Sequence, residues 1–123
     1  MTDEDIHQDT ATIALDHLAN AADEGVAELQ ELQRDLRNMR EHRLRGWSWR
    51  QVMSTASVPK PLVRMARIAS DLGAAGGSFR RALAQTLRSE GMQVSAIADL
   101  FDVSRQRVST LIRTDSGSTN TEP

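Results

Sequence analysis

Apolar residues recur three and four positions apart through the first third of the chain, and this spacing constrains the fold more than any other feature. The repeat runs for more than three heptads without a proline, at Leu15, Leu18, Ala22, Gly25, Leu29, Leu32, Leu36 and Met39. Such residues form a stripe along one face of an α-helix, as in a coiled coil. Gly46 stands where this helix should stop. We predict one long helix over residues 10–45, preceded by a disordered acidic tail at residues 1–9.

The apolar seam of residues 10–45 needs a partner. A seam of this length exceeds what a single small domain can cover, and this favours a homodimer through residues 10–45. The alternative is that the seam packs against the rest of its own chain, which otherwise has a small core.

Turn signals divide the chain after Gly46. Helices are predicted at residues 48–55, 61–72, 79–90, 94–101 and 104–113. Residues 73–78 are mostly glycine and alanine and are predicted to be a flexible link. Residues 114–123 contain no aliphatic or aromatic side chain, so we expect them to be disordered. Because no stretch alternates with period two, the sequence predicts an all-α protein.

Charge is distributed unevenly along the chain. The net charge is −2, yet residues 1–33 contain nine acidic and no basic residues. All 15 Lys and Arg lie in residues 34–113, together with only six acidic residues. A basic body of this kind indicates phosphate groups as a binding partner.

Residues 91–113 contain the pattern that is most informative about function, namely two short helices joined by a tight turn. Ala98 is a small residue at the point where two steeply crossed helices would meet. Asp102 occupies the turn between them and tolerates a left-handed backbone better than most residues. Ser104 is placed to cap the second helix. The apolar residues with the spacing to fill the wedge between the helices are Ile97, Phe101, Val103, Val108 and Leu111.

This segment resembles the helix-turn-helix family of DNA-binding proteins. The resemblance implies that residues 104–113 form a recognition helix, which enters the major groove of double-stranded DNA. Arg can make bidentate contacts to guanine and Gln to adenine, while Ser and Thr adapt to base edges or phosphate. The side chains expected to face DNA are Ser104, Arg105, Gln106, Arg107, Ser109, Thr110 and Arg113.

An internal repeat is found when the sequence is shifted by 45 residues. The shift aligns Gly46 with Gly91, Arg43 with Arg88, Val52 with Ile97, Met53 with Ala98, Val58 with Val103, and Val63 with Val108. Residues 46–72 are therefore predicted to form a first helix-turn-helix-like unit, and residues 79–113 the second. The Gly-x-Ser-Trp opening of the first unit resembles small actinobacterial or phage regulators.

The first unit departs from the pattern, since Met53 replaces the small crossing residue and Pro59 and Pro61 replace a polar helix start. Lys60, Arg64 and Arg67 are better suited to contact phosphates than to read bases, and both kinds of contact stay open for this unit. Arg50 is a further residue of the unit that is expected to bind DNA. We expect Trp49 to lie in the core and Trp47 to cover the end of the long helix.

Together these patterns predict a cytoplasmic, nucleoid-associated transcriptional regulator that binds specific sites on double-stranded DNA as a repressor. Two alternatives stay open: a sigma-factor-like or recombination accessory protein, and a helical protein-interaction module in which the helix-turn-helix is only a scaffold. The chain has no cysteine and no spacing typical of a metal or catalytic site, so we expect no enzyme, cofactor or small-molecule ligand. No apolar run approaches the roughly 20 residues of a membrane span.

Overall fold

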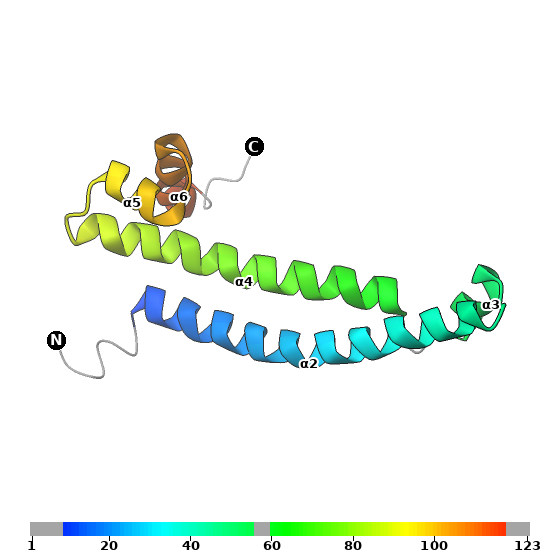
Figure 1. Cartoon of the computed structure of the whole chain (residues 1–123). Helices are drawn as coiled ribbons and strands as arrows, with labels where there is room; N and C mark the ends of the chain where they lie inside the picture. The colour runs from blue at the N-terminus through cyan, green and yellow to red at the C-terminus, as the bar shows by residue number, and fades with distance from the viewer. Residues whose placement is uncertain (1–8, 56–59, 118–123) are drawn as a thin grey trace. The chain divides into compact units, whose positions relative to one another are not determined.

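The long helix predicted from the apolar spacing is present as α2, which spans Thr10–Leu44 (Figure 1). The coordinates are a computed structural model, and the structure describes residues 9–55 and 60–117. Asp9 begins the helix, because its Oδ1 accepts a hydrogen bond of 2.7 Å from the Thr12 N–H. Such a cap satisfies one of the amide groups that the first turn leaves without a partner.

Four more helices follow α2 in the described residues. These are α3 (Trp49–Ser54), α4 (Pro61–Ser89), α5 (Val94–Phe101) and α6 (Arg105–Gly117). All regular structure in residues 9–55 and 60–117 is α-helical, which confirms the predicted fold class. The prediction of disorder from residue 114 is wrong for residues 114–117, which continue α6. The remaining predicted tails, residues 1–8 and 118–123, lie outside the described residues.

The prediction of a flexible link at residues 73–78 is also wrong, because α4 runs through this stretch without interruption. Two observations explain the continuity. Ala74 and Ala75 have high helix propensity, and side chains on both sides of the stretch are buried, among them Arg64 and Ala82. Tertiary packing at both ends therefore offsets the cost of about 1 kcal/mol that each helical glycine carries relative to alanine.

The chain divides into two compact units, and α2 and α4 contribute to both. The central unit is Ala19–Ala74, and the terminal unit comprises Met1–Leu18 and Ala75–Pro123. In the terminal unit, the main core joins the end of α4 to α5 and α6 through Ala84, Ile97, Ala98, Val108 and Leu111. A smaller cluster joins the start of α2 to α4 through Ala11, Ala14 and Ala82, with Phe79 packed against them.

In the central unit, α2 and α4 lie side by side in opposite directions (Figure 1). Of the leucines in the predicted seam of this unit, Leu32 is buried, whereas Leu29 and Leu36 are about half exposed. The polar residues Glu28 and Asp35 are directed at α4 instead, and both contact Arg64 there. The side of α2 that packs against α4 is thus rotated away from Leu29 and Leu36 and toward Glu28 and Asp35.

Candidate nucleic-acid interface

The turn between α5 and α6 has the geometry that the sequence predicts. Asp102 follows α5 in the left-handed conformation, with φ 57° and ψ 47°. The Val103 N–H then donates a 3.0 Å hydrogen bond to the Ala98 carbonyl. Ala98 is buried, as a close helix crossing requires. Ile97 and Val108 are completely buried between the helices, which confirms the predicted wedge.

α6 is fixed at its start and along its inner side. The Ser104 Oγ accepts a hydrogen bond of 3.0 Å from the Arg107 N–H, which confirms the predicted cap. Val108 and Leu111 anchor the inner side in the core. From α4, the Gln85 Nε2 donates a 3.3 Å hydrogen bond to the Ile112 carbonyl. The outer side of α6 is therefore held in one position relative to α4 and α5.

The predicted DNA-facing side chains lie on the outer side and flanks of α6. Gln106, Ser109, Thr110 and Arg113 are three, four and seven positions apart, so they share one face of the helix. Five of the seven predicted residues are exposed: Ser104, Arg105, Gln106, Arg107 and Arg113. Ser109 and Thr110 are half-buried, and the Thr110 hydroxyl donates to the Gln106 carbonyl at 3.0 Å.

The internal repeat is reproduced in the structure at the two glycine turns. Gly46 and Gly91 have φ values of 92° and 98°, which few other residues adopt. In both turns the residue after the glycine donates its N–H to the carbonyl four positions before the glycine, at 3.1 and 3.0 Å. Arg43 and Arg88 each donate from Nη1 to the carbonyl of that same residue, at 2.6 and 3.2 Å. The aligned residues Val52 and Ile97, which follow these turns, are both buried.

The structural match between the two repeats ends after these residues. Val63 is 52% exposed, whereas its aligned counterpart Val108 is completely buried. The prediction that Val63 belongs to a core is wrong, because the first turns of α4 bury Pro61 and Arg64 in its place. Val58 lies outside the described residues. A complete first helix-turn-helix is therefore not seen in the described part of residues 46–72.

The two tryptophans differ in their surroundings. Trp47 stacks on His42 at the end of α2, with ring centroids 4.2 Å apart and an interplanar angle of 12°, as predicted. The prediction of a core position for Trp49 is wrong, since 58% of this residue is exposed. The guanidinium carbon of Arg43 lies 5.0 Å from the centroid of the Trp49 ring, within the range of a cation–π contact.

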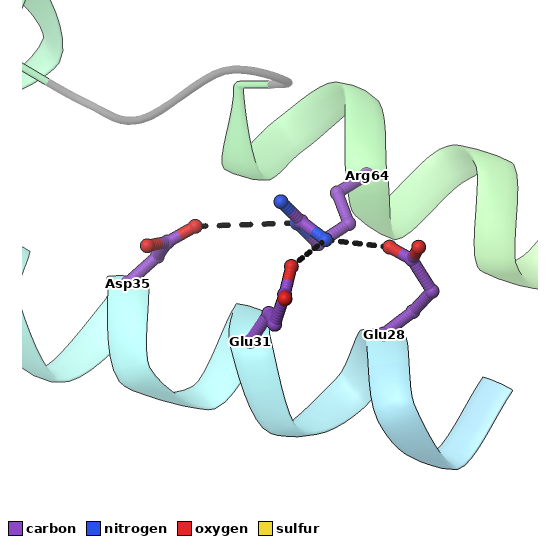
Figure 2. A network of polar contacts seen from close by, with 4 residues as sticks. All are labelled: Glu28, Glu31, Asp35 and Arg64. Atoms are coloured by element: carbon purple, nitrogen blue, oxygen red, sulfur yellow. Dashed lines mark hydrogen bonds and ion pairs between the residues drawn. The ribbon is translucent and has the colours of Figure 1, made fainter. Parts of the chain in front are cut away.

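Arg64 is not available to contact a phosphate, so its predicted role is wrong. Only 4% of Arg64 is exposed, and its Nη1 lies 2.6 Å from Glu28 Oε1 and 2.7 Å from Glu31 Oε1 (Figure 2). The Nε lies 4.0 Å from a carboxylate oxygen of Asp35. The sequence contains a signal for this network. Glu28, Glu31 and Asp35 are spaced three and four apart, so they form an acidic face of α2 that a cation would stabilise.

The other predicted DNA contacts of the first unit, Arg50, Lys60 and Arg67, are exposed in the central unit. The Lys60 Nζ lies 3.5 Å from the Met53 carbonyl. Arg67 lines a hollow of about 160 Å³ that it shares with the carboxylates Glu24, Glu28 and Asp71. Because acidic groups repel phosphate, Arg50 and Lys60 are better placed than Arg67 to meet a DNA backbone.

Comparisons with family models, with curated proteins and with solved structures found no match to this chain. Within residues 9–55 and 60–117, no three His, Cys, Asp or Glu side chains are arranged so that they could hold a metal ion. Among the helices of the same residues, none combines the length and the apolar character of a membrane span.

Proposed function

We propose that the protein binds double-stranded DNA at specific sequences, with α6 in the major groove, and regulates transcription by occupying an operator. One observation carries the proposal. The inner side of α6 is anchored by Val108 and Leu111, while Gln106 and Arg113 stand exposed on the outer side. A helix fixed from behind, with long polar side chains in front, meets the geometric requirement for reading bases in a major groove.

The residues of α6 take different parts in this proposal. Arg105 and Gln106 lie in the first turn, from which recognition helices reach base edges. Gln106 can pair with adenine, and Arg105 and Arg113 with guanine. Arg107 lies on the opposite flank of the helix from Arg105, because the two are separated by about 200°. From there Arg107 contacts the phosphates along one side of the groove.

The central unit adds sequence-independent contacts in this proposal. Arg50 and Lys60 are exposed cations at α3 and at the start of α4. Each phosphate that such a residue neutralises releases a counterion, so these residues contribute affinity without reading bases. Repression is the regulatory outcome we propose, because occupancy of an operator by a small protein is sufficient for it.

Selection of bound sequences from random duplexes tests the proposal. The unchanged chain should recover a defined motif, and Arg105→Ala or Gln106→Ala should each weaken binding to that motif by about 1–3 kcal/mol and relax one position. Arg80→Ala is a matched control, since Arg80 is an exposed arginine of the same unit on α4. Recovery of the same motif by both α6 variants, or of no motif by the unchanged chain, would contradict base reading by α6.

A further inference from the structure

The helix pair of the central unit has two sides of opposite character. Its antiparallel direction follows from the contacts of α4 with α2: Arg64 meets Glu28 and Glu31, while the later residue Asp71 shares a hollow with the earlier residue Ala21. An antiparallel pair has an approximate two-fold axis perpendicular to its plane. Residues that follow a contact residue by the same number of positions, on either helix, therefore lie on the same side of the pair.

On one side of the pair, the residues four positions after Gly25 and Leu32 on α2, and after Pro61 and Ile68 on α4, are apolar and exposed. Leu29 and Leu36 stand on α2, and Met65 and Leu72 on α4, each between 42% and 52% exposed. With two more exposed neighbours they form what we call the apolar face: Val26, Leu29, Leu36, Leu62, Met65 and Leu72. A groove of about 370 Å³ runs along its α2 half, from Val26 to Leu36.

On the other side of the pair, the residues three positions after Ala21 and Glu28 on α2, and after Arg64 and Ile68 on α4, are charged. Glu24 and Glu31 stand there on α2, and Arg67 and Asp71 on α4. Six exposed apolar residues are thus gathered on one side of the pair, and Val63 is an exposed apolar residue that lies off it. Contiguous apolar patches of this kind mark interaction sites on proteins.

We propose that the apolar face binds the same face of a second copy of the chain, in an antiparallel two-fold dimer. The area is sufficient for this occupant. Six side chains of this size, each about half exposed, present roughly 600 Å², so two copies would bury roughly 1,200 Å², the lower limit for a stable and specific interface. A two-fold interface uses one patch twice and therefore needs no separate partner surface.

The charges of α2 also favour a second copy. Between residues 16 and 31 the helix contains five acidic and no basic residues, whereas residues 34–43 contain four arginines and two acidic residues. Antiparallel pairing of α2 with its copy places the acidic half of each against the basic half of the other. Within the groove itself the polar residues are Gln30 and Gln33, which carry no charge. Glu24, Glu28 and Glu31 are turned to α4 or to the other side of the pair. The charges of α2 beside the apolar face are then Asp23 in the acidic half and Arg37 and Arg40 in the basic half. Self-association thus opposes these unlike charges at the rim and no like charges at the centre.

This proposal goes beyond DNA binding and does not depend on it. It also differs from pairing through the whole predicted seam, because Leu32 of that seam is already buried within the single chain, whereas Leu29 and Leu36 are about half exposed.

Sedimentation equilibrium on the full chain, from about 1 to about 100 µM, tests the dimer in a concentration range suited to an interface of this size. The unchanged chain should reach a mass of twice 13.6 kDa. Leu29→Glu should weaken the dimer by about 30-fold or more, since it buries a charge at the centre of the face. Its helix content by circular dichroism should stay unchanged, because Leu29 is half exposed within the single chain.

Val63→Glu is the matched control. Val63 and Leu29 are 52% and 51% exposed in the same unit, but Val63 lies off the apolar face. The control should remain dimeric, and so should Arg105→Ala, which separates this test from that of DNA binding. Met65→Gln is a milder change on the other helix of the face. It should also weaken the dimer, and it replaces Leu29→Glu in the test if that variant loses helix content. A single-chain mass for the unchanged protein at about 100 µM, or equal dissociation by the Leu29 and Val63 variants, would overturn the proposal.

Discussion

Replacing Arg64 with methionine distinguishes an internal role for this residue from a role on DNA. Methionine keeps much of the apolar stem and loses the donors that meet Glu28 and Glu31 at 2.6 and 2.7 Å. A hydrogen bond to a charged group contributes about 1.5–3 kcal/mol. The two carboxylates are 41% and 54% exposed and can regain water, so we discount each bond to about 1 kcal/mol. The free energy of unfolding should therefore fall by about 2 kcal/mol.

For a chain of this length, a loss of about 2 kcal/mol lowers the melting temperature by roughly 8 °C. Thermal and urea unfolding followed by circular dichroism measure both quantities. A double-mutant cycle assigns the loss to the network. Glu28→Gln with Glu31→Gln should destabilise the unchanged chain, yet should be neutral or stabilising beside Arg64→Met, because three neighbouring carboxylates then repel one another.

Arg80→Met is the control, on an exposed residue of the same helix. It should leave the melting temperature within about 2 °C, since exposed substitutions away from special features change little. The reasoning would be refuted by an Arg64→Met variant that melts like the unchanged chain and binds random duplexes as weakly as Lys60→Ala. Such a result would mean that Arg64 leaves its carboxylates to reach DNA.

Three further sites test the fold, namely the glycines of α4, Ser104 and Ile97, and each substitution is read out by urea unfolding. Gly73→Ala and Gly76→Ala should each add about 0.5–1 kcal/mol to the free energy of unfolding, because both sites are helical and a Cβ meets nothing within 4 Å; a loss of stability would contradict a continuous α4. Ser104→Ala should cost about 1 kcal/mol through the lost cap, and Ser104→Asp, which can also cap, should not. Ile97→Ala should cost about 2–5 kcal/mol and abolish DNA binding, whereas the exposed Leu100 of the same helix should tolerate alanine.

Features determined by adjacent residues could be predicted from the sequence. The bounds of α5 follow from the turn residues that flank it, since Gly91 and Asp102 are both left-handed. The start of α6 follows from the hydroxyl of Ser104, which bonds only three residues ahead. Such contacts need no knowledge of the rest of the fold, and the outer face of α6 could be derived in the same way from helical periodicity.

Features that depend on distant residues were missed. The apolar spacing of α2 predicts a helix but does not determine which side of it meets α4. That choice depends on Arg64, which is 36 residues from Glu28 and draws carboxylates inward where leucines were expected. The glycines of α4 have the composition of a linker, and packing on either side of them determines that they are helical. In the same way, Val63 fits a repeat of the sequence but not the side of α4 that is buried.

The paired glycine turns bear on how fast this chain can fold. Each is closed by hydrogen bonds that span no more than five residues, including the arginine that bonds four residues ahead. Loops of about ten residues or fewer close within roughly 100 ns, faster than a chain of this size collapses. We therefore expect the turns at the carboxyl ends of α2 and α4 to form before residues distant in the sequence pack against these helices. The search for those partners is shortened accordingly, since the chain turns at Gly46 and Gly91 are closed by local hydrogen bonds.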